Sequence, residues 1–167
     1  LDKGGRNALM ASALGGNAAV TELLIARKVD PKLEDRNGLN ALVYAASAGH
    51  DSVVLALKKA GVQKGTDVAL AYAMRGCRVP LFRSLLAGNN MDLAPIQLGG
   101  DTLLMLAAGA NCREGVELML GRGADVNQVS EDGETALMRA AGGGFPDLVQ
   151  FLLDKGADME VQNKRNQ

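Results

Sequence analysis

The chain has 167 residues, of which 47% are hydrophobic but only 3% are aromatic, and its formal net charge at pH 7 is −1. A basic face that neutralises the phosphates of a nucleic acid is therefore not expected. No apolar run approaches the roughly 20 residues of a membrane-spanning helix. These features predict a core of small aliphatic residues, no nucleic-acid partner and no membrane insertion.

Glycines recur along the chain with a period of 33 residues. Gly5 and Gly38 lie 33 residues apart, as do Gly100 and Gly133, and each stands two residues before an Asn or a Thr. Periods of about 20 to 50 residues are typical of stacked units rather than of one globular core. The sequence therefore predicts a solenoid.

Each unit is predicted to contain a turn and two antiparallel helices. The first helix follows a side chain that can cap free backbone N–H groups, namely Asn7, Asn40, Asp67, Thr102 or Thr135. It ends at a residue that tolerates a positive φ, namely Gly16, Gly49, Gly76, Asn111 or Gly144. The expected helices are 8–14, 18–27, 41–47, 51–59, 68–74, 78–87, 103–109, 113–121, 136–142 and 146–154. The predicted fold class is therefore all-α, with short hairpin turns between the helix pairs.

The third unit is shorter than its neighbours. Gly61 and Gly88 are only 27 residues apart, and the missing residues fall just before Gly65, where a hairpin turn is expected. The next connection is longer by two residues. We therefore predict that the third unit lacks its hairpin turn and that residues 89–99 form an expanded loop.

The two cysteines, Cys77 and Cys112, fall at equivalent positions of neighbouring units. Neighbouring helices pack about 8 to 10 Å apart, whereas the Cα atoms of a disulfide lie within about 7 Å of each other. The cysteines lack CxxC spacing and have no second metal ligand near them in the sequence. We therefore expect free thiols, no metal site and a reducing, cytoplasmic compartment.

The unit as a whole resembles the ankyrin repeat. That family's pattern, D-x-x-G-x-T-P-L-H-x-A-A-x-x-G-H followed by I-V-x-L-L-L and G-A-D-V-N, is matched best by Asp35 to His50 and by Gly123 to Asn127. The resemblance implies one ankyrin-repeat domain over residues 1–167, which we expect to be a segment of a longer chain. The units run near residues 2–34, 35–63, 64–92, 97–129 and 130–162, and 163–167 begin a further unit.

No arrangement of residues in the sequence supports catalysis. His50 is the only histidine, so no nucleophile system can draw on a second one, and we expect it to have a structural role. The glycines at 99–100 and 142–144 lack the phosphate-binding G-x-x-x-x-G-K-[ST] pattern. The sequence therefore predicts a protein that is not an enzyme and holds no cofactor.

The resemblance also implies a surface for a partner protein or peptide. In ankyrin-repeat proteins, ligands most often lie across the hairpin tips and the exposed, concave face of the first helices. Carried over by position, the candidate residues are Lys3, Arg6, Arg36, Asn37, Leu39, Tyr44, Ser47, Leu98, Asp101, Glu131, Asp132, Glu134 and Arg139. The tips are basic in the first two units and acidic in the last two, which would orient a partner of opposite polarity. Charges that merely keep the loops soluble are the alternative.

Two classes of function remain. The first is a monomeric adaptor or scaffold that binds another protein or a peptide. The second is a structural or regulatory segment of a larger multidomain protein that makes intramolecular contacts. Neither end of the chain has an evident polar cap, which repeat arrays need for solubility, and this supports the second class. The full-length sequence would distinguish the two.

Overall fold

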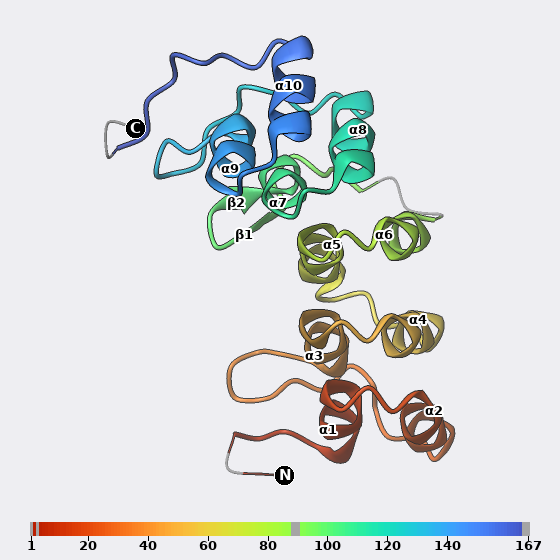
Figure 1. Ribbon diagram of the computed structural model, residues 1–167. Coiled ribbons are helices and arrows are strands. Elements are labelled where there is room, and N and C mark those ends of the chain that lie inside the picture. The colour runs from red at the N-terminus through yellow and green to blue at the C-terminus, as the bar shows by residue number, and fades with distance from the viewer. Residues whose placement is uncertain (1, 3, 88–90, 165–167) are drawn as a thin grey trace. The chain divides into compact units, whose positions relative to one another are not determined.

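The computed structural model describes residues 2, 4–87 and 91–164 (Figure 1). The chain forms two compact units. Unit 1 comprises Leu1–Ala73 and Pro80–Asn89, and unit 2 comprises Met74–Val79 and Asn90–Gln167. Among the described residues, no helix is long and apolar enough to cross a membrane.

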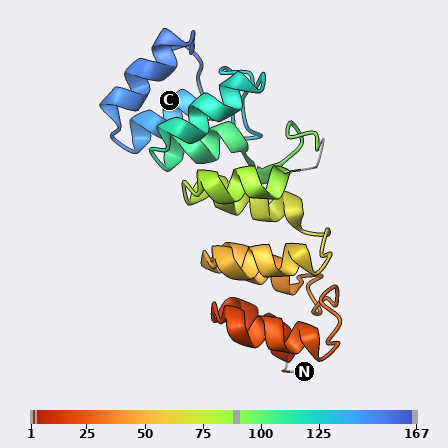
Figure 2. The same cartoon turned by 90° about the vertical axis from the view of Figure 1, so that its right-hand side faces the viewer.

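Unit 1 is built from helix pairs. It contains α1 (Ala8–Leu14), α2 (Ala18–Ala26), α3 (Ala41–Ala48), α4 (Asp51–Lys59) and most of α5 (Thr66–Arg75) and α6 (Val79–Leu86). The first helices α1, α3 and α5 follow one another in one column, and α2, α4 and α6 follow in a second (Figure 1). Figure 2 shows these pairs as successive layers. Leu9, Leu42, Val53 and Leu57 are almost fully buried between the layers.

Unit 2 combines helix pairs with a small hairpin. It contains β1 (Gln97–Leu98), β2 (Asp101–Thr102), α7 (Leu103–Gly109), α8 (Arg113–Gly121), α9 (Ala136–Gly142) and α10 (Pro146–Asp154). Helix α7 packs on α8 and on α9, and α9 packs on α10. The two strands are antiparallel, with Leu98 opposite Asp101. The turn between them needs positive φ at two successive residues, and Gly99 and Gly100 supply it with φ of 63° and 86°.

The observed helices agree with the predicted ones to within two residues at each end. Asn7, Asn40, Thr102 and Thr135 are confirmed as caps, because each side chain accepts a hydrogen bond from the backbone N–H three residues later. The predicted cap Asp67 is wrong. Helix α5 already begins before it and places its carboxylate in the first turn, where the helix dipole favours a negative charge.

The predicted end of the first helix in the third unit is also displaced by one residue. Gly76 does not have a positive φ, and Cys77 has a φ of 52° instead. Cys77 therefore occupies the position that Gly16, Gly49, Asn111 and Gly144 hold in the other units, all of them with positive φ. The structural equivalent of Cys77 is Asn111 and not Cys112.

The prediction of free thiols is wrong, because Cys77 and Cys112 form a disulfide with a Cα–Cα distance of 5.3 Å. The prediction used the distance between packed helix axes, which does not apply here because neither cysteine lies within a helix. Cys77 lies in the turn between α5 and α6, and Cys112 directly precedes α8. Turns at the ends of packed helices can approach more closely than the helix axes do.

The short connection before α5 contains neither helix nor strand between residues 60 and 65. It is nevertheless tied to the residues around the second hairpin turn. The Asn40 Nδ2 donates to the carbonyl of Lys64 at 2.9 Å, and the Lys64 ammonium lies 2.6 Å from a carboxylate oxygen of Glu34. The neighbouring Gly65 has a φ of 84°, and a Cβ there would lie 2.6 Å from a methyl group of Val43.

Of the expanded loop predicted at 89–99, residues 89 and 90 lie outside the described residues. Residues 91–96 have no helix or strand, and the end of the predicted loop instead forms β1. The two-residue strands provide a hairpin turn of the kind expected between helix pairs.

Candidate functional site

The second hairpin tip comprises residues 35–39 of unit 1. The carboxylate of Asp35 determines its conformation. Its Oδ1 accepts hydrogen bonds from the backbone N–H groups of Asn37 and Leu39, both at 2.9 Å. Its Oδ2 accepts one from the Tyr44 hydroxyl at 2.8 Å. The Leu39 N–H, the Tyr44 hydroxyl and the Asn37 N–H together hold the pKa of Asp35 below its usual range. Asp35 is thus the common hydrogen-bond acceptor around which the candidate residues Asn37, Leu39 and Tyr44 are arranged.

The first hairpin tip, which includes Asp2 and Arg6, contacts the second through the side chains of Arg6 and Tyr44. The guanidinium of Arg6 lies over the Tyr44 ring, 5.9 Å from its centroid. Arg6 also forms an ion pair with Asp2, with Nε 2.6 Å from Oδ2. Accepting hydrogen bonds from the backbone N–H and the side chain of Arg6 lowers the pKa of Asp2. The positive charge of Arg6 is therefore largely offset within the tip.

The remaining described candidates of unit 1 are exposed or half-buried. Arg36 and Asn37 are exposed and Leu39 is half-buried. Among the described residues, the side chain of Arg36 forms no ion pair, while its backbone N–H donates to Gly4 of the first tip at 3.2 Å. Ser47 is exposed near the end of α3, and its hydroxyl donates to the Tyr44 carbonyl at 3.0 Å. The candidate Lys3 lies outside the described residues.

In unit 2, Asp101 and Arg139 form an ion pair between β2 and α9. The Nε and Nη2 atoms of Arg139 donate to the same oxygen, Asp101 Oδ1, at 3.0 and 2.7 Å. The side chain of Asp101 is only 20% exposed, so the pair is partly shielded from water. Each residue neutralises the other, and neither presents a free charge to a partner.

The fifth hairpin tip comprises residues 130–134. Hydrogen bonds connect it to the segment that follows α10. The candidate Glu134 accepts from the Asn163 Nδ2 at 2.7 Å, and the carbonyl of Asp132 accepts from the Lys164 backbone N–H at 2.9 Å. A Cβ on Gly133 would lie 3.0 Å from the Asn163 Cα. The glycine at residue 133 therefore allows the tip to pack closely against this segment.

A small hollow of about 130 Å³ lies between the turn of the β1–β2 hairpin, which is the fourth tip, and the fifth tip. Its lining includes four candidates, which are Asp101, Glu131, Asp132 and Arg139. Glu131 and Asp132 are exposed, and within the part of the chain that the structure describes they form no ion pair. Since Arg139 is already paired, the hollow has a net negative charge. It suits the cationic end of one Lys or Arg side chain. Leu98, the remaining candidate, is half-buried on β1.

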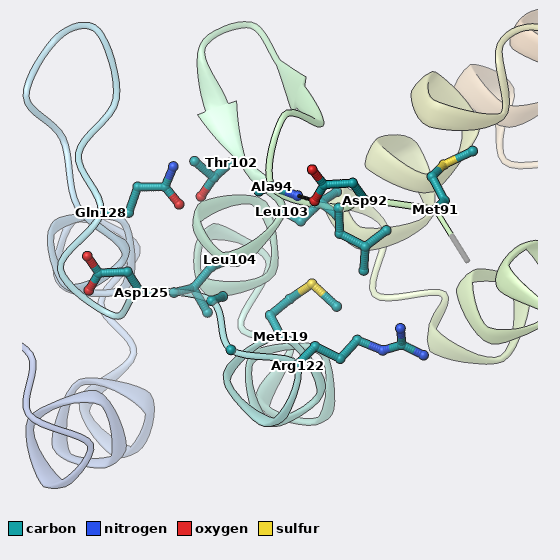
Figure 3. A pocket seen from close by; sticks show the side chains of 13 residues that line it. Met91, Asp92, Ala94, Thr102, Leu103, Leu104, Met119, Arg122, Asp125 and Gln128 are labelled. Atoms are coloured by element: carbon teal, nitrogen blue, oxygen red, sulfur yellow. Dashed lines mark hydrogen bonds between the residues drawn. The ribbon is translucent and has the colours of Figure 1, made fainter. Parts of the chain in front are cut away.

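A larger hollow of about 540 Å³ lies below the β1–β2 hairpin and contains none of the candidate residues (Figure 3). Leu103, Leu104 and Met119 give it apolar walls, and Asp92 and Arg122 add charges. Its volume is within the range of about 300 to 1,000 Å³ that is usual for small-ligand pockets. The sequence signal for it is the lengthened connection before β1, because residues 91–94 form one wall.

His50 lies beside α1 and has the structural role expected for it. Its Nε2 is 3.0 Å from the Leu14 carbonyl, near the end of α1. A Cβ on Gly16 would lie 2.5 Å from the imidazole ring, so the ring fills the space above that glycine. Among the described residues, no group of three or more His, Cys, Asp or Glu side chains could hold a metal ion.

Comparison with known proteins agrees with this architecture. The family model described as ankyrin repeats (3 copies) matches residues 1–68 and 68–163. No curated protein matches the chain. The family match covers nearly the whole sequence, and the paired helices with intervening hairpin turns have the arrangement that the repeat pattern predicts. The chain therefore belongs to the ankyrin-repeat family.

Proposed function

We propose that this chain is a non-enzymatic adaptor or scaffold module that binds a protein or peptide through its hairpin tips and the adjoining first helices. Ankyrin repeats are in general protein–protein interaction modules, and the family is typically non-catalytic. The observation that carries the proposal is the arrangement of the second tip. There, Asp35 points inward and holds the turn, while Arg36 and Leu39 remain available to a partner.

Tips that internal hydrogen bonds hold in one conformation support binding, because less conformational freedom is lost when a partner docks. In unit 2, an ion pair holds Asp101 and Arg139 together, and Glu131 and Asp132 remain exposed. The proposed contact in unit 1 is therefore basic and contains an apolar residue, Leu39. The proposed contact in unit 2 is acidic. A partner would carry an acidic group for the first contact and a basic side chain for the second.

The alternative is that the same tips contact another part of a larger polypeptide. The proposal takes the chain as a monomer, without a nucleic-acid partner, in line with its net charge of −1. The expected cytoplasmic placement rested on free thiols. The Cys77–Cys112 disulfide removes that ground, because disulfides persist mainly in oxidising compartments.

Site-specific photo-crosslinking in the native extract tests the proposal. A photoreactive amino acid replaces Leu39 or Ser47 on the proposed surface, or Lys59 on the second helix α4 as the matched control, since Lys59 is also exposed. We expect a protein adduct from positions 39 and 47 and none from position 59. Adducts from position 59 alone would contradict the proposed surface. Crosslinks within the same full-length chain would instead support the intramolecular alternative.

A further inference from the structure

The turn between α5 and α6 has an unusual residue at its left-handed position. The other units place Gly16, Gly49, Asn111 or Gly144 there, which are residue types that tolerate a positive φ. Cys77 has a φ of 52° at this position, and the backbone gives no reason for a cysteine. The side chain does, because its Sγ is bonded to Cys112.

The two halves of this disulfide differ in their surroundings. Cys77 is exposed, whereas Cys112 is only 1% exposed. The Cys112 Sγ lies 3.1 Å from the place that a Cβ on Gly115 would occupy, and the Met74 Sδ and the Ala107 Cβ surround the same place at 2.8 and 3.2 Å. The sulfur of Cys112 is therefore enclosed by apolar atoms, and a nucleophile from solvent meets Cys77 first.

Cys112 is also placed to act as the leaving group. It is the N-cap residue of α8 (Arg113–Gly121), and its side chain makes no capping hydrogen bond. The first-turn N–H groups of a helix lack partners within the helix, and its N-terminus stabilises a negative charge. Both effects offset part of the cost of forming a thiolate on the buried Cys112 when the S–S bond breaks.

We propose that Cys77 is a site of thiol–disulfide exchange with a small, acidic monothiol. The incoming thiolate attacks the Cys77 Sγ. The bond between Cys77 and Cys112 breaks, a bond between Cys77 and the incoming sulfur forms, and Cys112 leaves as a thiolate that takes a proton from water. One S–S bond replaces another, so no net oxidation or reduction takes place. The exposed Arg75, two residues before Cys77, favours a thiol that carries carboxylates.

Reduced glutathione is the probe, because it is a monothiol with two carboxylates. The intact protein is incubated with it, remaining thiols are alkylated, and peptide mapping locates both modifications. We expect glutathione on Cys77 and the alkyl group on Cys112, in excess of the reverse pattern by about ten-fold or more. Arg75→Glu should slow the reaction with glutathione more than the reaction with 2-mercaptoethanol, because the attacking thiolate of 2-mercaptoethanol carries no carboxylates.

Single-cysteine variants provide an independent readout. The lone Cys77 thiol in Cys112→Ser should be alkylated about ten-fold faster than the lone Cys112 thiol in Cys77→Ser, because of the difference in exposure. If either variant fails to fold, the peptide map of the wild-type protein decides. The proposal is overturned if glutathione attaches mainly to Cys112, or if the disulfide resists glutathione until the protein unfolds. It is equally overturned if the two thiols remain unlinked after treatment with oxidised glutathione.

Discussion

Asp35 shows how a single side chain determines the shape of a hairpin tip. Its carboxylate accepts hydrogen bonds from Leu39, Asn37 and Tyr44. These donors favour the charged form and hold the pKa of Asp35 below its usual range. The hydrogen bond from the Tyr44 hydroxyl to Asp35 also raises the pKa of Tyr44. The ionised carboxylate therefore contributes to folding stability as well as to the shape of the tip.

The stability that Asp35 contributes should depend on pH. Because its pKa is lowered in the folded state, the contribution is fully present above the unfolded pKa of about 4 and is lost as pH falls through the folded pKa. We expect Asp35→Asn to be less stable than the wild type at neutral pH, with the difference shrinking as the pH falls below the unfolded pKa of about 4. Urea unfolding midpoints at several pH values measure this. Glu22→Gln, at an exposed position of α2, is the control, and a difference that is the same at every pH would contradict the account.

At the level of single residues, the sequence predicted most of the local features, with Asp67 and Gly76 as exceptions, and missed the long-range ones. The caps Asn7 and Thr135 could be predicted because a cap contacts its own helix within three residues. The pairing of Arg139 with Asp101 spans 38 residues, and no local pattern indicates it. The expectation of free thiols failed for a related reason, because it used the spacing of helices for two cysteines that lie in turns.

The connection before α5 was predicted to lack a hairpin, and its packing could not be predicted. The sequence shows that residues are missing there. It does not show that Gly65 packs on Val43 or that Lys64 is bonded to Asn40 and Glu34. These contacts depend on how closely a shortened connection approaches the preceding repeat. The two-residue strands β1 and β2 were likewise not foreseen as strands, since they are too short to show alternation.

Two glycines of this connection form a matched pair for a mutational test. Gly61 and Gly65 both have a φ of 84°, but a Cβ on Gly61 has open space and a Cβ on Gly65 would meet Val43 at 2.6 Å. Both Ala variants should lose about 1 to 2 kcal/mol from the positive φ, and Gly65→Ala should lose about 1 to 3 kcal/mol more from overpacking. Urea unfolding measures both. Equal losses would show that the close packing against α3 is absent in solution.

The disulfide should contribute strongly to the stability of unit 2. It joins residues 35 positions apart, and closing a loop of that length stabilises a fold by about 4 kcal/mol in the chain-entropy model. We expect a dithiol reductant to lower the free energy of unfolding by an amount of this order, measured by urea unfolding with and without reductant. The double variant Cys77→Ser/Cys112→Ser is the control and should not respond to reductant. If reductant lowered the free energy of unfolding of this control by the same amount, the effect would not come from the disulfide.

For the molecule as a whole, the charges available to a partner differ from those counted in the sequence. The sequence suggested basic tips followed by acidic tips. In the structure, Arg6 is offset by Asp2 and Arg139 is offset by Asp101. Arg36 in unit 1 and Glu131 and Asp132 in unit 2 remain, so the alternation of sign now depends on fewer residues. The family and the repeat architecture could be predicted from the sequence, but the identity of the partner could not, because ankyrin repeats share a scaffold rather than a ligand.

Lys59 is a better control for the binding surface than its neighbour Lys58. The Lys58 ammonium donates to the side chains of Gln63 and Thr66, and burial lowers its pKa. Reversing its charge would disturb the start of α5. Lys59 is exposed on the same helix, and among the described residues it forms no ion pair. Lys59→Glu therefore changes net charge by the same amount as Arg36→Glu at a different place.

The most direct test of the proposed function is the association rate of the crosslinked partner with these two variants. Exposed charges at an interface act mainly on association, and salt screens their effect. We predict that Arg36→Glu slows association about three- to ten-fold at low salt and weakens its dependence on salt, whereas Lys59→Glu has little effect. Equal effects of the two substitutions, or an effect of Lys59→Glu alone, would contradict binding at the hairpin tips.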